Sequence, residues 1–304
     1  MIRQRTLKTS VRATGVGVHT GHKVAMVLRP APIDTGIVFC RSDLPGNPAV
    51  PAHASYVGNT TMATVIEKDG ARVSTIEHLM SAFAGLGIDN AFVDVSAEEV
   101  PIMDGSAGTF VFLLQSAGIV EQAAAKKYLR ILKRVEIERG DRRAWLEPFN
   151  GFKVAFAIEF AHPVFEATAK EVDIDFATVS FVRQVARART FGFTQDVEKM
   201  RSLGLGRGGS LDNAVVVDDF RVLNADGLRM DGEFVMHKAL DAVGDLYTAG
   251  RPIIGAFHGH KSGHEMNNLL LRKLLADRTA FEEVTFDRLE ALPRAFANLA
   301  ASPA

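Results

Sequence analysis

The feature that most constrains the fold is a pattern that occurs twice along the chain. Residues 74–84 have the apolar periodicity of an amphipathic helix, and the apolar run Ala91–Val95 follows. Residues 232–249 repeat this arrangement and precede the apolar run 251–257. A helical period that gives way to a short apolar run indicates a helix followed by a buried strand. Because each helix carries a histidine, we expect duplicated α+β domains that meet face to face, with both histidines near the interface.

Further helices, strands and turns are predicted around this repeat. Alternation around residues 7–11 and the run 24–28 indicate a hairpin across a glycine-rich turn. The first helix has Ser74 or Thr75 as a candidate cap and ends at Gly85 and Gly87, and Ser106 is a candidate cap for the next helix. The second half is predicted to hold strands over residues 128–138, 142–147 and 153–160, and a helix from about residue 263.

The apolar periodicity lapses around Glu121–Lys127, and we place a domain boundary there. This divides the chain into a first α+β domain of residues 1–124 and a second of residues 125–304. The first would carry one helical histidine and the second the other.

Charge and composition exclude several partners. The 35 basic and 36 acidic residues nearly cancel, so no global field attracts nucleic acid. The best apolar stretch, residues 110–120, is well short of the roughly 20 residues that cross a bilayer. A single cysteine, Cys40, excludes an intrachain disulfide and suits a reducing compartment. We therefore expect a cytoplasmic protein without an integral membrane segment.

His237 and Asp241 form the most informative pair. Four residues apart on a helix, they face the same side and can share one metal ion, although a surface pair has the same spacing. Catalytic zinc usually takes three protein ligands, and His78 on the other histidine-bearing helix can supply the third. Glu77, immediately before His78, is then free to act as a general base. The alternative for His78 and Glu77 is an interface histidine beside a solvent-exposed glutamate.

Two other segments have weaker signals. Three histidines lie within residues 257–264, but His258 and His260 are expected at a strand end as ordinary polar residues, with His264 opening the next helix. Asp245, one turn beyond Asp241, is the candidate partner that keeps His264 charged. The glycine-rich residues 204–210 lack the Gly-Lys-Ser/Thr ending of a phosphate-binding loop and are expected to form a flexible loop.

Taken together, these segments resemble the zinc-dependent UDP-3-O-acyl-N-acetylglucosamine deacetylases of lipid A biosynthesis. The resemblance runs from Gln4–Lys8 and Gly15–Gly21 to Glu283–Phe286. The most specific matches are Ser74–Leu79, Ala84–Asn90, Pro101–Ser106, Arg189–Phe193, His237–Asp245 and Lys261–His264.

The resemblance implies a fold and a set of roles. It implies two similar α+β domains, each a small sheet layered with helices and each with an inserted element, and one zinc ion held by His78, His237 and Asp241; iron(II) also suits this ligand set. The catalytic residues that it implies are Glu77 as general base, His264 as general acid and oxyanion stabiliser, Asp245 as the partner of His264, and Thr190 as an oxyanion contact. The substrate contacts that it implies are Phe160 stacked on uracil, Lys238 and Asp196 on the sugar nucleotide, and Phe191 with residues 203–217 along an acyl passage.

The implied reaction is hydrolysis of the N-acetyl amide of a lipid-linked sugar nucleotide, the committed step of lipid A biosynthesis in Gram-negative bacteria. It releases acetate and UDP-3-O-acyl-glucosamine, and the family leads us to expect a monomer. Two other hypotheses remain at this point. One is a non-catalytic or kinase-like module that binds phosphates through residues 204–209, and the other is a protein whose zinc is purely structural.

Overall fold

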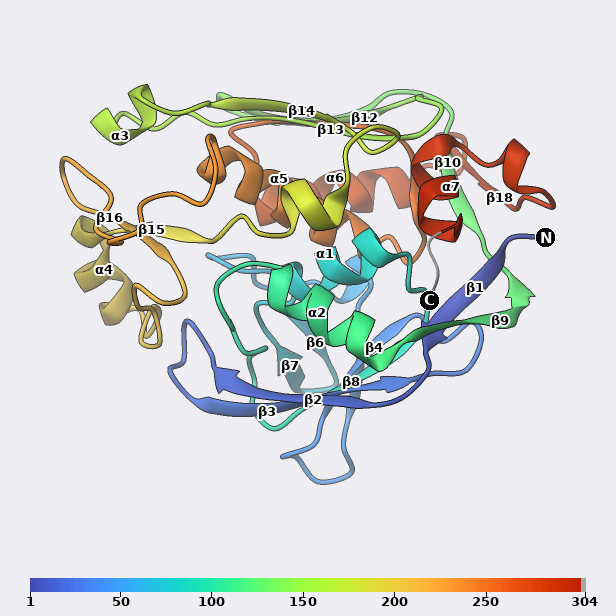
Figure 1. Cartoon of the computed structure of the whole chain (residues 1–304), viewed down its shortest axis with the longest axis horizontal. Coiled ribbons are helices and arrows are strands. Elements are labelled where there is room, and N and C mark those ends of the chain that lie inside the picture. Colours follow the sequence, from blue (N-terminus) through green and yellow to red (C-terminus); the bar gives the residue numbers. More distant parts are fainter. Residues whose placement is uncertain (302–304) are drawn as a thin grey trace.

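Four layers of secondary structure are stacked in the computed structural model, which describes residues 1–301 (Figure 1). A sheet forms each outer layer, and two layers of helices lie between the sheets. The mixed α+β class predicted from the sequence is confirmed, with several sheets layered with helices.

The first half of the chain builds the lower sheet and the helices above it. The sheet has the order β2-β3-β8-β4-β5, with β2 Val11–Val16, β3 Lys23–Pro30, β8 Ala91–Val95, β4 Ile37–Arg41 and β5 Ala49–Pro51. Its helices are α1 Glu77–Leu86 and α2 Gly108–Ala117. The predicted hairpin is β2 with β3, in which Val11 pairs with Leu28. Leu7 instead ends the separate strand β1, Arg3–Leu7, which pairs with β9, Ile119–Ala125.

The second half builds the upper sheet around β17 Ile253–His260. This strand pairs with β10 Tyr128–Ile131, β12 Arg142–Glu147 and β13 Phe152–Ala157. The outer strands are β11 Val135–Arg139, β14 Glu171–Asp175 and β18 Phe281–Val284. The helices beneath it are α5 Glu233–Tyr247 and α6 His264–Ala276.

Smaller elements make up the rest of the secondary structure in residues 1–301. Three two-stranded sheets are β1 Arg3–Leu7 with β9 Ile119–Ala125, β6 Ile66–Lys68 with β7 Ala71–Val73, and β15 Phe191–Phe193 with β16 Val215–Val217. The remaining α-helices are α3 Pro163–Glu166, α4 Val197–Ser202 and α7 Arg294–Ala301. One-turn helical segments occupy 54–56, 181–185, 194–196 and 289–291.

Two predicted boundaries were wrong. The single strand expected over residues 128–138 is two strands, because β10 pairs with β17 and β18 whereas β11 pairs with β12. Neither Ser74 nor Thr75 caps α1: its N-cap is Ile76, without a side-chain hydrogen bond. Thr75 has a left-handed backbone with φ 58°, and its hydroxyl donates to Glu99 instead.

Other predicted helix ends agree more closely with the structure. Gly87 ends α1 in the left-handed conformation that glycine favours, whereas Gly85 lies inside the helix. The Ser106 hydroxyl accepts a hydrogen bond from the Gly108 amide at 3.1 Å, although the N-cap position of α2 is Ala107.

The central contact of the fold is the crossing of α1 and α5, which position the functional site. A Cβ atom added at Gly244 would lie 2.0 Å from the Glu77 carbonyl oxygen. Only glycine therefore allows the two helix backbones to approach so closely here. The start of α1, where Glu77 and His78 lie, is held against the C-terminal half of α5.

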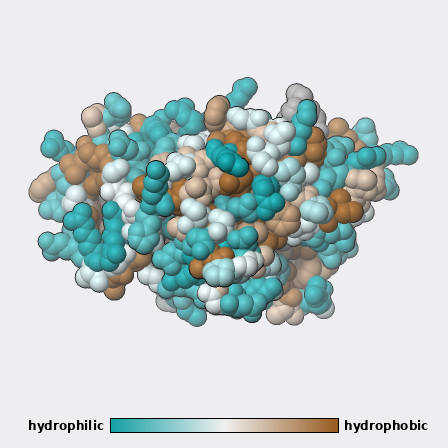
Figure 2. Space-filling view, turned by 90° about the horizontal axis from the view of Figure 1, so that it is seen from below, coloured by the Kyte–Doolittle hydropathy of each residue, from teal (hydrophilic) through white to brown (hydrophobic). Residues whose placement is uncertain are grey.

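The outer surface offers no broad apolar face in the view from below. Polar side chains are interspersed with isolated apolar ones on this face (Figure 2). The longest helix in residues 1–301, α5, has 15 residues, and none of the helices described there is long and apolar enough to span a bilayer.

Candidate active site

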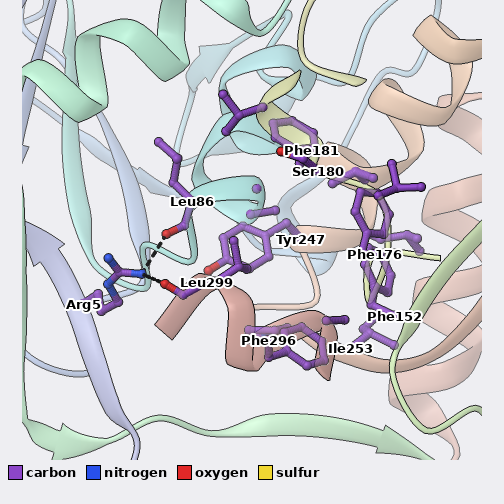
Figure 3. A pocket seen from close by; sticks show the side chains of 18 of the residues that line it. Arg5, Leu86, Phe152, Phe176, Ser180, Phe181, Tyr247, Ile253, Phe296 and Leu299 are labelled. Carbon is purple, nitrogen blue, oxygen red and sulfur yellow. Dashed lines mark hydrogen bonds between the residues drawn. The ribbon is translucent and has the colours of Figure 1, made fainter. Parts of the chain in front are cut away.

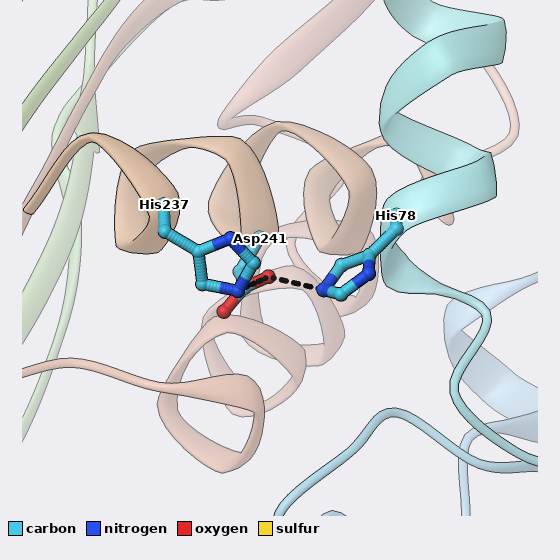
Figure 4. A group of neighbouring side chains, drawn as sticks. All are labelled: His78, His237 and Asp241. Carbon is cyan, nitrogen blue, oxygen red and sulfur yellow. Dashed lines mark ion pairs between the residues drawn. The ribbon is translucent and has the colours of Figure 1, made fainter. Parts of the chain in front are cut away.

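Three side chains from the two central helices converge on one point. His78 lies in the first turn of α1, and His237 and Asp241 lie one turn apart on α5. Their ligand atoms all lie within 4.8 Å of one another, and both imidazoles point toward the Asp241 carboxylate (Figure 4). The three residues are at most 4% exposed. The structure thus brings together the three predicted metal ligands, which are far apart in the sequence.

The distances between these atoms fit a metal ion. Asp241 Oδ1 lies 3.4 Å from His78 Nε2 and 3.3 Å from His237 Nε2. Ligands about 2.0–2.1 Å from a tetrahedral zinc ion lie about 3.3–3.4 Å from each other. Asp241 Oδ1 is buried and has no hydrogen-bond partner among the described residues, so a cation would satisfy it.

The protonation of the ligands also suits a cation. His237 Nδ1 is 3.0 Å from the Ala188 carbonyl oxygen, which favours the tautomer that leaves Nε2 free. Burial lowers the pKa of His237 to about 3, so the ring is neutral. Burial acts to raise the pKa of Asp241, but His237 and Lys238 hold it well below its ordinary value. A neutral imidazole and an ionised carboxylate are the forms that bind zinc.

Glu77 lies beside this group and is 3% exposed. Its Oε2 accepts a hydrogen bond from the Thr64 amide at 3.0 Å, and its Oε1 lies 3.8 Å from His264 Nε2. Burial raises the pKa of Glu77 above its ordinary value, and the nearby His264 opposes the shift. A carboxylate with a raised pKa is a better proton acceptor near neutral pH.

His264 begins α6 and faces the same space as Glu77. Its Nδ1 is 2.8 Å from Asp245 Oδ2, which confirms the predicted proximity of the two side chains. Burial acts to lower the pKa of His264, but the carboxylates of Asp245 and Glu77 outweigh it and raise the pKa to about 9. His264 is therefore protonated at neutral pH and can donate a proton.

Two residues of this network were missed in the sequence. Thr64 donates its hydroxyl to Asp245 Oδ1 at 2.6 Å and its amide to Glu77, so it links the two carboxylates. Asn267 donates to Asp245 Oδ2 at 2.9 Å. Asn267 lies one turn after His264 on α6, a spacing that could have signalled its position, whereas nothing in the sequence around Thr64 predicts this role.

Phe160 and Phe191, predicted as separate substrate contacts, belong to one aromatic cluster. Their ring centroids are 5.7 Å apart, and Phe165 and Phe193 lie 4.6 Å and 5.7 Å from Phe160. Phe191 also approaches His237, with 6.4 Å between ring centroids. The cluster therefore connects the candidate metal ligands with strand β15 and helix α3.

The remaining predicted contacts, Lys238, Thr190 and Asp196, have different surroundings. Lys238 Nζ pairs with Asp241 Oδ2 at 2.9 Å and lies 5.7 Å from the centre of the Phe191 ring. Thr190 directly precedes Phe191 in the sequence and follows, by two residues, Ala188, whose carbonyl contacts His237. The backbone amide of Thr190 donates to the Gly105 carbonyl. Asp196 is exposed at the end of a short helical turn.

The two weaker sequence signals are accounted for by structural contacts. His258 stacks on Trp145 at 4.6 Å and contacts Glu147 at 3.1 Å, as expected of an ordinary polar residue near a strand end. In the glycine-rich loop, the amides of Arg207 and Gly208 donate to the carbonyls of His19 and Val18. The loop is thus anchored to the first half rather than free, and two amides that a phosphate would need are already used.

A comparison with protein families agrees with this site. Residues 4–276 match the family model described as UDP-3-O-acyl N-acetylglycosamine deacetylase. The match covers nearly the whole chain and includes each residue of the candidate site.

Proposed function

This chain belongs to the UDP-3-O-acyl N-acetylglycosamine deacetylase family, the metal-dependent amidohydrolases of lipid A biosynthesis, and we propose that the residues around His78 catalyse its reaction. The reaction proposed is hydrolysis of the N-acetyl group of UDP-3-O-acyl-N-acetylglucosamine, with release of acetate and UDP-3-O-acyl-glucosamine. The observation that carries this assignment is the convergence of His78, His237 and Asp241 beside Glu77 and His264.

His78, His237 and Asp241 would hold one zinc ion per chain. When bound, zinc supplies Lewis acidity, which lowers the pKa of a water molecule and polarises a carbonyl group. Two imidazoles and one carboxylate also suit iron(II), so the donor set defines the class of metal better than its identity.

Glu77 is proposed as the general base. Its carboxylate accepts a proton from the attacking water as the new C–O bond forms. The Thr64 amide fixes Oε2, which keeps the carboxylate in one orientation during this transfer. Thr190 is proposed to donate its hydroxyl to the oxyanion that develops on the amide oxygen.

His264 is proposed as the general acid. Because it is protonated at neutral pH, it can stabilise negative charge on the substrate and then transfer its Nε2 proton to the departing nitrogen. Asp245 accepts the hydrogen bond from Nδ1 and so leaves Nε2 directed to the reaction. The C–N bond breaks as the sugar amine leaves in neutral form.

The aromatic cluster supports the proposed substrate contacts. Phe160 would stack on uracil, Lys238 and Asp196 would contact the polar part of the sugar nucleotide, and Phe191 with residues 203–217 would border the acyl chain. Lys238 is already paired with Asp241, so it would contact substrate while still holding that ligand in place.

The four-layer arrangement supports the proposed organisation into domains 1–124 and 125–304. Each half has one large sheet and its own helices, and the site lies where α1 and α5 meet (Figure 1). The hairpin β6–β7 and the unit from β15 to β16 are proposed as the inserted elements. A monomeric, cytoplasmic enzyme is also proposed, the monomer from the family resemblance and the location because a single cysteine suits a reducing compartment.

A direct assay tests this function. Purified metal-loaded protein should release acetate from UDP-3-O-acyl-N-acetylglucosamine, and mass spectrometry should find one zinc ion per chain. His78→Ala should weaken zinc binding more than about 100-fold, since loss of even an outer partner of a ligand costs about 10–100-fold. The exposed His22→Ala is the matched control. Intact substrate, or full activity in His78→Ala, would refute the proposal.

A further inference from the structure

A cavity lies outside the proposed active site. It has a volume of about 520 Å³, within the roughly 300–1,000 Å³ of small-molecule sites. It is bordered by the C-terminal turns of α1 and α5, by α7 and by residues 176–182 (Figure 3). None of the proposed metal ligands, catalytic residues or substrate contacts lines it.

The walls of the cavity are largely apolar. Five aromatic side chains line it, namely Phe152, Phe176, Phe181, Tyr247 and Phe296. Phe152 and Phe176 stack with 5.3 Å between ring centroids. The Tyr247 hydroxyl is occupied by a hydrogen bond to the Ile88 carbonyl, so this residue presents its ring rather than a polar group. Such walls favour an alkyl chain over a polar ligand.

The charged side chains that line the cavity are both basic. Its lining includes two arginines, Arg5 and Arg251, and no aspartate or glutamate. Arg251 is one-third exposed and only loosely paired, with 3.7 Å between its Nε and Glu283 Oε2. The cavity therefore complements an anion.

Arg5 is the more unusual of the two, because it is 9% exposed and has no carboxylate partner within 4.0 Å among the described side chains. Asp89, the acid that attracts it most, pairs with Lys126 at 3.0 Å. Arg5 Nη1 donates instead to the carbonyls of Leu86 and Leu299, at 3.2 Å and 2.9 Å (Figure 3). Buried charges are ordinarily paired, so an anion beside this guanidinium would supply a missing interaction.

We propose that this cavity is a second ligand site, which binds a single-chain amphiphile with its alkyl tail among the aromatic rings and its anionic head toward Arg5 and Arg251. The exposed Ser180 also lines the cavity, and its hydroxyl can donate to the head group. The site differs from the proposed acyl passage of the substrate, because Phe160, Phe191 and residues 203–217 do not border it.

The position of this site couples it to the central helices. Ala84 of α1 and Val243 of α5 border the cavity, and the same helices carry His78 and Asp241. A ligand that bridges both helices binds the folded protein and not the unfolded chain, so it should raise the melting temperature.

Calorimetric titration of the zinc-loaded full chain with octanoate, nonanoate and decanoate tests the tail. Each added methylene should tighten binding about threefold to fourfold while the tail stays inside the cavity. A carboxylate and a phosphate monoester share the proposed head chemistry, so decyl phosphate is titrated separately. Binding of either supports the site, and their relative affinities distinguish a fatty acid from a phosphorylated lipid.

Two variants locate the binding. Val182→Trp fills the cavity and should weaken decanoate binding at least about tenfold. If that variant folds poorly, Val179→Trp should have the same effect. Leu132→Trp is the control, because Leu132 is also a partly exposed apolar residue but lies outside the cavity. Arg251→Met should weaken decanoate binding but not 1-decanol binding, whereas Arg294→Met, outside the lining, should change neither. Deacetylase activity without added amphiphile should be unchanged in all of these variants.

Three results would overturn the proposal. The first is the absence of decanoate and decyl phosphate binding. The second is undiminished binding in both tryptophan variants, which would place the amphiphile in the substrate passage. The third is a wild-type protein that binds no amphiphile together with a Val182→Trp variant whose oligomeric state differs from that of the wild type. That result would make the cavity a protein interface.

Discussion

Asp241 and Asp245 lie one turn apart on α5, and they differ in the hydrogen-bond partners of their carboxylates. Asp241 leaves Oδ1 without a donor and directs it at two imidazoles. Asp245 is saturated by Thr64, His264 and Asn267. At the scale of single residues, the first aspartate is open to a cation and the second orients a proton donor.

Glu77→Gln tests the base without changing the shape of the site. The amide cannot accept the proton, so kcat should fall by about 10²–10⁴-fold while zinc content stays at the wild-type level. Acetate release and metal analysis on the same preparation check both parts. Glu67→Gln, at an exposed strand position, should retain full activity. Loss of zinc from Glu77→Gln would instead make Glu77 a ligand.

The pH dependence follows from His264. Its pKa is raised to about 9 from an ordinary value of about 6.5. Its ion pair with Asp245 therefore stabilises the fold fully below about pH 6.5, and this contribution is lost as pH rises to about 9. Activity should also fall through the upper pKa, because only the protonated ring can donate.

Asp245→Asn should move this alkaline limb of the pH–rate profile to lower pH by about one to three units, because a neutral amide no longer favours the charged ring. Proton NMR of the His264 ring would report the same shift independently of turnover. An unchanged limb in this variant would assign the titration to another group.

The sequence predicts residues with helical spacing better than it predicts tertiary partners. The spacing of His237 and Asp241 is enough to place them on one face of a helix, and the repeated helix–strand pattern brings His78 into the same site. Thr64 has no such signal, because its contacts with Glu77 and Asp245 depend on chain packing across 13 and 181 residues. Lys238 is predicted as a substrate contact, whereas its pairing with Asp241 follows from a spacing of three residues on α5.

At the scale of elements, the crossing of α1 and α5 controls the site. Gly244→Ala would place a methyl group 2.0 Å from the Glu77 carbonyl oxygen, so the helices must separate. Overpacking of this kind should lower the free energy of unfolding by about 1–3 kcal/mol and reduce kcat, since Glu77 moves with α1. Thermal and urea denaturation measure the first effect, and acetate release measures the second.

Gly192→Ala is the control for thermal stability, because a methyl group there has no neighbour within 4 Å. Equal melting temperatures for the Gly244 variant and the wild type would show that the helices can move apart without cost.

Element types were easier to predict than element ends. The long helices and the strands after them follow from apolar periodicity, which burial enforces over many residues. The start of α1 could not be predicted from capping preferences, since the Thr75 hydroxyl is drawn to the buried Glu99 carboxylate. The break between β10 and β11 likewise depends on which strands pair with each, and that is a property of the whole sheet.

At the scale of the whole molecule, metal and fold should be separable. The helices and both sheets share one extensive apolar core, which does not depend on the three ligands. Removal of the metal with a chelator should therefore abolish deacetylation while the far-ultraviolet circular dichroism spectrum and cooperative unfolding persist. Added zinc should restore activity. Global unfolding on chelation would show that the metal is structural instead.

The origin of the metal ligands in both halves has a consequence for biosynthesis. His78 emerges from the ribosome long before His237 and Asp241, and the two helices must pack before three donors meet. A nascent chain that ends before α5 offers only one of them, so it should not retain zinc. Metal acquisition is then a late event in the life of the polypeptide, and it marks the chains in which α1 and α5 have packed together.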